Sequence, residues 1–205
     1  MMSPRINAPA GGWGLSHPRR TVVRFGRSGP GGASAGVTTH SFVDESKTPY
    51  FLFAAALIPA SQVNAARQIV AGFVLPGQRR VHFKSERDSR RAQLMAQFTE
   101  LSIQAVIYQA RDRVNEKAAR DRCLTALVRD HMTRRVQRLV IEREESRLHS
   151  DRLIIGAEAK DLEFEHLRAH EDPLLAVPDG IAWCWGRGGH WRVKAKHLVT
   201  DVIEA

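Results

Sequence analysis

The sequence predicts an α/β domain built on a mixed sheet that starts with a β-hairpin and carries helices on both faces. Two predicted strands, residues 41–44 and 50–58, flank a tight turn that contains Pro49, which is typical of a hairpin. Behind them, segments with helical spacing of apolar residues alternate with short β-branched runs. The 205 residues are 43% apolar, which is enough for one packed core.

The first helix is predicted to begin near Ser61 and to end at Pro76–Gly77, because serine caps helices and the Pro-Gly pair breaks them. Its expected apolar face consists of Val63, Ala66, Ile69, Val70 and Phe73. Residues 81–83 predict a short strand, and residues 89–101 predict the next helix.

The rest of the chain continues this alternation. We expect strands over 103–110, 136–144 and 162–166, a long amphipathic helix over 115–134, and a last helix over 172–185 with a kink at Pro178. Residues 151–159 and 191–202 fit either helix or strand.

The N-terminal segment differs in composition from everything that follows. Residues 1–39 hold eight of the 15 glycines, four of the nine prolines and five arginines, with no acidic residue. Because such a segment cannot form a packed core, we predict a disordered basic tail over residues 1–37 and a single domain over 38–205.

Three explanations of this tail stay open. It could be a basic arm that binds nucleic acid, or an Arg-rich transit peptide. It could also result from a start codon placed too far upstream, with translation beginning near Val37.

Charge, apolar runs and cysteines limit the class of protein. The net charge is +9, and without the tail 26 basic side chains remain against 22 acidic ones, a net charge of +4. This balance permits nucleic-acid binding without requiring it. The longest apolar run, residues 50–58, is too short to span a bilayer, and two cysteines are too few for a disulfide framework. These features predict a cytoplasmic protein.

Carboxylates occur where three apolar segments end. Asp44 and Glu45 follow the first strand in "HSFVDES", Glu142 follows "LVI", and Asp179 interrupts the last apolar segment. Carboxylates are costly to bury unpaired, so a cation is expected beside them. Mg²⁺ prefers such oxygen ligands and commonly takes substrate phosphates as well. The ordinary explanation is that these acids are solvated or paired with nearby arginines.

The motifs "HSFVDES", "LPGQRRVHFKSERDSRR", "LVIERE" and "PLLAVPDGIAW" resemble a group of bacterial proteins, the domain-of-unknown-function family 3800. The resemblance covers about residues 38–200 and leaves the tail outside. It implies a ribonuclease H-like fold with an acidic centre that binds Mg²⁺ or Mn²⁺. Asp44 takes the place of the first-strand metal ligand, Glu142 that of the central-strand acid, and Asp179 that of the last-helix acid.

The proposed site residues differ from the family pattern in two ways. Glu142 stands where an aspartate is more usual, and the acid expected on the first helix has no clear counterpart. Glu86 and Asp88 are candidates for that acid, and Glu45 is a further candidate metal ligand. Lys84 would stabilise developing charge on a phosphodiester as a point cation.

Arginine and histidine side chains are further candidates for contacts with phosphate or metal. Arg134, Arg135 and Arg138 form the least compensated basic patch and are predicted phosphate contacts. His166 and His170 have the spacing of a zinc pair only if that segment is helical, and no third ligand supports zinc.

The first hypothesis is therefore a divalent-metal-dependent nuclease that cleaves phosphodiester bonds in RNA, DNA or a hybrid. The alternative is a catalytically inactive module that keeps the fold and binds nucleic acid or a partner protein. A small-molecule enzyme or an accessory protein of a mobile or defence system is a weaker third hypothesis.

Overall fold

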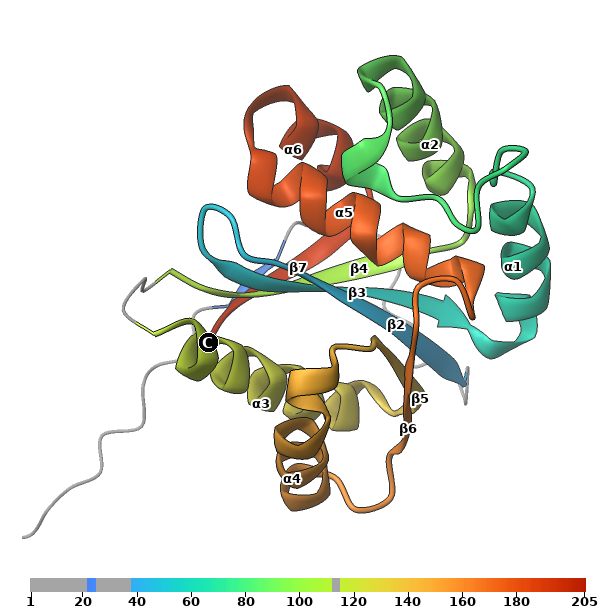
Figure 1. Cartoon of the computed structure of the whole chain (residues 1–205). Helices are drawn as coiled ribbons and strands as arrows, with labels where there is room; N and C mark the ends of the chain where they lie inside the picture. The colour runs from blue at the N-terminus through green and yellow to red at the C-terminus, as the bar shows by residue number, and fades with distance from the viewer. Residues whose placement is uncertain (1–21, 25–37, 112–114) are drawn as a thin grey trace, which may run out of the picture.

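The computed structural model describes residues 22–24, 38–111 and 115–205, and their strands form one seven-stranded sheet (Figure 1). The strands are β1 (Val22–Arg24), β2 (Thr39–Ser46), β3 (Phe51–Pro59), β4 (Gln104–Ala110), β5 (Val136–Glu142), β6 (Glu163–Leu167) and β7 (Val199–Glu204). The helices are α1 (Val63–Ala71), α2 (Asp88–Glu100), α3 (Glu116–Arg134), α4 (Leu148–Glu158), α5 (Ala176–Arg187) and α6 (Gly189–Lys196).

The sheet has the order β1-β7-β4-β3-β2-β5-β6. The hairpin β2–β3 continues antiparallel into β4, while β5 runs parallel to β2, β6 parallel to β5, and β7 parallel to β4. The predicted mixed sheet, with its hairpin first and helices on both faces, is confirmed. The fold is therefore a mixed α/β fold.

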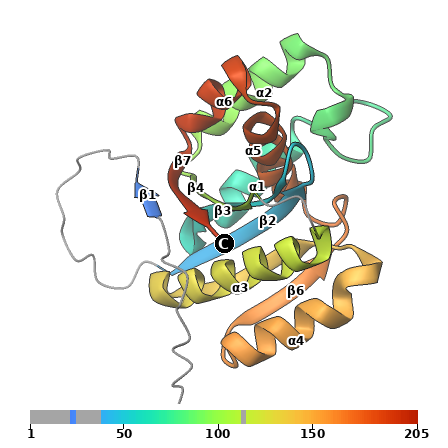
Figure 2. The ribbon, with the colours of Figure 1, turned by 90° about the vertical axis from the view of Figure 1, so that its left-hand side faces the viewer.

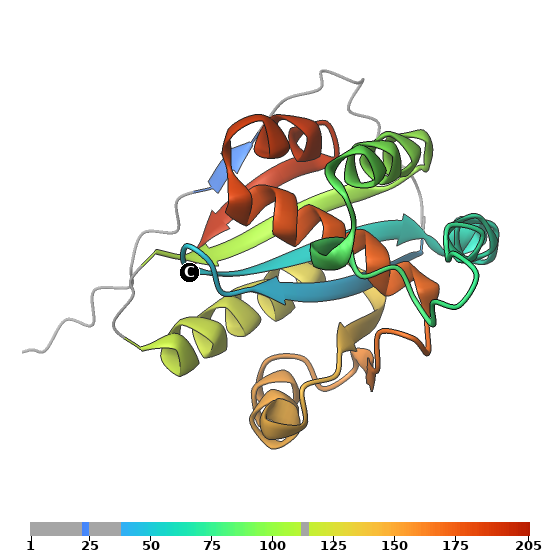
Figure 3. The same cartoon turned by 45° about the horizontal axis from the view of Figure 1, so that its top comes forward.

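Helices cover both faces of the sheet and create two apolar cores (Figures 1 and 3). Alternation along β2 directs Phe42 into the core under α1, α2, α5 and α6, and Val43 into the core over α3 and α4. The central strand β3 is buried from Phe51 to Ile58, because it has strands on both sides and helices on both faces.

Several local predictions are corrected. Residues 81–83 are not a strand; a 3₁₀ turn, Phe83–Ser85, takes their place. In α1, Ile69 is 46% exposed instead of lying on the apolar face. No kink is needed at Pro178, because α5 starts at Ala176 and proline is tolerated in the first turn. The undecided segments resolve as α4, α6 and β7.

The predicted tail over residues 1–37 falls mostly outside the described residues. Its three described residues are ordered as a strand, since Val22–Arg24 pair antiparallel with Asp201–Ile203 of β7 (Figure 2). The structure thus places a short strand within the segment for which a tail is predicted. In the part of the chain that the structure describes, no helix is long and apolar enough to cross a membrane.

The close approach of α5 to the hairpin turn leaves no room for a side chain at Gly186. A Cβ atom there would lie 2.3 Å from the carbonyl oxygen of Thr48. We therefore expect Gly186→Ala to lower the free energy of unfolding by about 1–3 kcal/mol in chemical denaturation. Gly156→Ala is the matched control, because Gly156 lies in α4 with open space around it and should gain about 0.5–1 kcal/mol. Equal effects of the two substitutions would contradict this packing.

A buried histidine joins α3 to the sheet. His131 Nε2 lies 2.7 Å from the hydroxyl oxygen of Ser41, and the ring meets Tyr108 edge-on at 6.1 Å between centroids. Burial lowers the pKa of His131 from 6.5 to about 3; the charge of Asp130 opposes this shift and that of Arg134 adds to it. The ring is thus neutral in the folded protein at neutral pH.

This burial makes the stability depend on pH. The unfolded chain binds a proton at His131 near pH 6.5, whereas the folded chain does not until about pH 3, so stability falls as the pH decreases through that window. From pH 7 to pH 5 we expect the free energy of unfolding to fall by about 2 kcal/mol from this residue. Urea titrations should show that His131→Asn loses this slope and that His149→Asn, at an exposed position, keeps it.

Candidate metal centre

Two strand ends bring Asp44 and Glu142 together. β2 and β5 are parallel neighbours whose last paired residues are Val43 and Ile141, and the two carboxylates come one residue later in each strand. Asp44 has the same side-chain direction as Phe42, and Glu142 the same as Val140, so both carboxylates face α5. This adjacency follows directly from the parallel register.

The third carboxylate comes from the helix above them. Asp179 lies in the first turn of α5, which packs across β2 and β3 (Figure 3). Its Oδ2 accepts a hydrogen bond of 2.9 Å from the backbone N–H of Phe83. A helix N-terminus favours a negative charge, so its position is stabilised twice. Asp44, Glu142 and Asp179 are referred to below as the carboxylate cluster.

The three charges act on one another. Burial raises the pKa of Asp44 well above its ordinary value, and the neighbouring charges of Glu142 and Asp179 raise it further, against one 2.7 Å hydrogen bond from the N–H of Glu45. Burial also raises the pKa of Asp179, and Glu142 adds to this effect. Clustered carboxylates with raised pKa values are common at functional sites, because they suit a cationic ligand.

The donor chemistry of the cluster fits a divalent cation. All three side chains offer hard oxygen atoms, and Mg²⁺ usually takes only one or two carboxylates, with water and phosphate filling its other positions. Among residues 22–24, 38–111 and 115–205, no three His, Cys, Asp or Glu side chains are already arranged to hold a metal ion. A cation would therefore have to draw the carboxylates of the cluster together.

Basic groups partly neutralise the cluster. Arg80 Nη1 lies 3.3 Å from Glu142 Oε1, and both Arg80 and His82 lower the pKa of Asp179. The sequence interpretation missed Arg80 and the Phe83 N–H donor. The basic run "GQRRVHFK" was a signal that this segment approaches acids, but its partner is 62 residues away in the chain.

The structure does not bring Glu45 into the cluster. Its Oε2 accepts a 2.9 Å hydrogen bond from Arg120, whose guanidinium stacks over Phe53 in the core on the α3 side. Lys47 lies 3.2 Å from the other oxygen. Adjacent residues of a strand point to opposite faces, so Asp44 and Glu45 cannot both line the same site.

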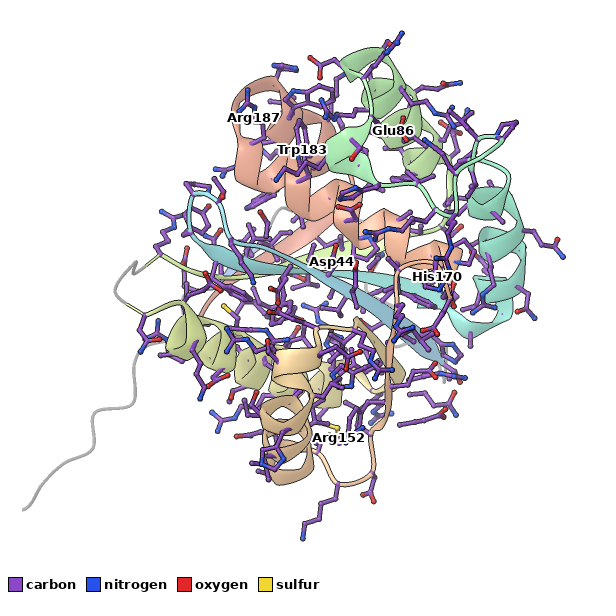
Figure 4. The ribbon with its side chains drawn as sticks, viewed as in Figure 1. Asp44, Glu86, Arg152, His170, Trp183 and Arg187 are labelled. Atoms are coloured by element: carbon purple, nitrogen blue, oxygen red, sulfur yellow. The ribbon has the colours of Figure 1, made fainter. Side chains whose placement is uncertain are left out.

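Glu86 and Lys84 also lie apart from the cluster. Glu86 Oε1 accepts a 3.3 Å hydrogen bond from Gln78, and Figure 4 shows Glu86 beside α2 while Asp44 lies on the sheet beneath α5. Lys84 is exposed in the 3₁₀ turn, and its carbonyl accepts from Arg91. His82, two residues before Lys84, is held by Ser85 at 2.9 Å instead of extending along a strand.

The three predicted phosphate contacts do not form one patch. Arg134 bonds Asp130 at 2.6 Å and Asp201 at 2.7 Å on the α3 side of the sheet. Arg138 points to the opposite side, where it bonds Glu165 at 2.5 Å. Arg135 ends α3 with a left-handed backbone and is exposed. The positive charges of Arg134 and Arg138 are thus paired with carboxylates, and the pairs Arg134–Asp201 and Arg138–Glu165 join residues far apart in the sequence.

The segment with the histidine pair is not helical. His166 belongs to β6, where its Nε2 lies 3.0 Å from a carboxylate oxygen of Asp151, and His170 follows after the strand. The i, i+4 geometry required for a zinc pair is therefore absent between these two histidines.

Asp151 belongs to a buried ionic network under the opposite face of the sheet. Both of its oxygens bond the guanidinium of Arg120, and both side chains are 1% exposed. The bonds to Arg120 and His166 lower the pKa of Asp151 although burial opposes this. The network ties α3, α4, β6 and β2 together directly behind the carboxylate cluster.

Comparisons with known proteins give a similarity in structure but none in sequence. No protein-family model matches the chain, and its sequence matches none of the curated proteins. Among solved structures, a chain from the PCNA:RNase HII complex of Archaeoglobus fulgidus is similar over 77% of each chain, with 15% identity and a TM-score of 0.49. The function must therefore be argued from the side chains of this chain.

Proposed function

We propose that the chain is a divalent-metal-dependent hydrolase of phosphodiester bonds in nucleic acid. The observation that carries the proposal is the convergence of Asp44, Glu142 and Asp179 on one face, with the pKa of Asp44 raised by burial and by the other two charges. Three oxygen donors under mutual repulsion are suited to Mg²⁺ or Mn²⁺. The resemblance to the family of unknown function described above supports the same assignment.

Each residue of the cluster has a definable task. Asp44 and Glu142 would hold the cation from neighbouring strands, and Asp179 would hold it from the helix. A bound divalent ion supplies Lewis acidity and a lowered pKa of water. Arg80, already beside Glu142, would orient a phosphate at the edge of the cluster, since guanidinium groups match phosphate geometry.

The second candidate is a catalytically inactive module that binds nucleic acid or a partner protein. The observation in its favour is that Arg80 already neutralises part of the cluster, while the described carboxylates are not arranged around an ion. Such a module would bind Mn²⁺ weakly.

The test is a cleavage assay on labelled single- and double-stranded RNA and DNA and an RNA–DNA hybrid, with Mg²⁺, with Mn²⁺ and with chelator. We expect cleavage of at least one substrate that depends on the metal and stops in chelator. If folded protein cleaves none of them, and calorimetry detects no Mn²⁺ binding, the second candidate replaces the first.

A further inference from the structure

A small cavity lies next to the carboxylate cluster, with a volume of about 210 Å³. Its floor is apolar and includes the buried side chains of Val70, Val81 and Ala176. An apolar cavity of about 150 Å³ is large enough for a benzene ring, so this one has room for a planar ring of similar or somewhat larger size.

The rim of the same cavity is basic. Arg79, Arg80 and His170 line it, and none of the described residues that line it is acidic. The guanidinium of Arg80 is also 3.3 Å from Glu142, so the same side chain lines the cavity and contacts the cluster. An apolar floor with a cationic rim matches a ligand that carries both a flat ring and a negative charge.

A second, larger cavity of about 450 Å³ on the same side of the sheet has a different character. Glu165, Glu171 and Asp172 line it, and its two arginines are already engaged. Arg67 bonds Asp172 at 2.8 Å, and Arg138 bonds Glu165. Phosphate would be repelled there, which leaves the smaller cavity as the better site for an anionic ligand.

We propose that the small cavity holds one unstacked nucleobase of the substrate, with the adjoining phosphate facing Arg79 and Arg80. Guanidinium planes stack on bases and bond phosphates, and apolar side chains accept the flat faces of a base. A base inside a duplex is stacked and paired, and so it cannot enter. The preferred substrate is therefore single-stranded, or unpaired close to the bond that is cleaved. This inference rests on the proposed function and names its substrate class.

The test measures binding without cleavage. Fluorescence anisotropy in chelator would compare a labelled ten-nucleotide single strand with the blunt duplex of the same sequence. We expect the single strand to bind at least tenfold more tightly. Ala71→Trp, which fills the cavity from its exposed edge, and Arg79→Gln, which removes a cation from the lining, should each weaken single-strand binding by about tenfold, a loss of about 1.4 kcal/mol.

Two matched controls lie on α4, on the opposite side of the sheet. Ala157→Trp and Arg152→Gln change exposed residues of the same kinds, and Figure 4 shows Arg152 on α4 far from His170. Both should bind the single strand like the unmodified protein. Circular dichroism would verify that all four variants are folded.

The outcomes separate this inference from the proposed function. Equal affinity for duplex and single strand, or cavity variants that bind like the α4 controls, would overturn the inference even if metal-dependent cleavage is found. Tight single-strand binding that depends on Ala71 and Arg79, without cleavage in any metal, would support the cavity assignment and refute the nuclease.

Discussion

Replacing Asp44 by asparagine is expected to lower metal-dependent cleavage by about a thousandfold or more while leaving the fold intact. Burial and the neighbouring charges of Glu142 and Asp179 raise the pKa of Asp44 well above its ordinary value, so a cation would stabilise its charged form. A metal ion stabilises the transition state by several kcal/mol, and about 4 kcal/mol corresponds to a thousandfold change in rate. The measurement is the single-turnover cleavage rate on the best substrate of the panel.

A control for this prediction is Glu86→Gln, which removes a carboxylate on the same side of the sheet but outside the cluster. We expect it to change the rate less than threefold. In chelator, Asp44→Asn should melt no lower than the unmodified protein, because the substitution relieves repulsion from Glu142 and Asp179. Mn²⁺ should raise the melting temperature of the unmodified protein, because it binds the folded state. The Asp44→Asn variant should not show this increase. A Glu86 variant as inactive as the Asp44 variant would contradict the assigned ligands.

Replacing Asp151 by asparagine is expected to lower the free energy of unfolding by about 3–5 kcal/mol. Removing one partner from a buried ion pair leaves the other charge uncompensated, and here Arg120, 1% exposed, would keep Glu45 as its remaining carboxylate partner among the described residues. For a chain of this size each kcal/mol lowers the melting temperature by roughly 2–4 °C. Chemical denaturation followed by circular dichroism would measure the loss.

The comparison for this stability loss is an exposed ion pair between the same two helices, α3 and α4. Arg129 bonds Glu158 at 2.6 Å, but its side chain is 62% exposed, so Arg129→Gln should cost less than about 1 kcal/mol. Similar losses for the two substitutions would show that burial of the Arg120–Asp151 pair is unimportant. Because Arg120 also bonds Glu45, the Asp151 variant should in addition loosen the end of β2 that carries Asp44.

Much of the fold was accessible from local sequence patterns. The hairpin, the strand at β4 and the long helix α3 were predicted within a few residues, because β-branched runs and four-residue apolar spacing are local properties. The segment over 81–83 was mispredicted, since an alternating run of three residues carries little information. Its 3₁₀ turn is stabilised by a distant carboxylate, Asp179, and by Arg91, which bonds the Phe83 carbonyl.

The positions of Asp44 and Glu142 at strand ends were also predictable from the sequence, because a carboxylate directly after an apolar strand marks the edge of a sheet. The sequence did not predict that the two side chains are neighbours, because this depends on the parallel pairing of β5 with β2, almost one hundred residues apart in the chain. The same applies to the arginines. Whether Arg134 or Arg138 is free for phosphate depends on Asp201 and Glu165, which only the packed fold places beside them.

The sequence by itself determined the α/β class, the order of most elements and the three acids of the cluster. Only the tertiary structure decided that Asp44 joins Glu142 and Asp179 while Glu45 pairs with Arg120 on the opposite face. The physical reason is that periodicity and propensity act over a few residues, whereas charge pairing depends on distance in space. Strand register and helix packing set that distance, and both are determined by contacts between remote parts of the chain.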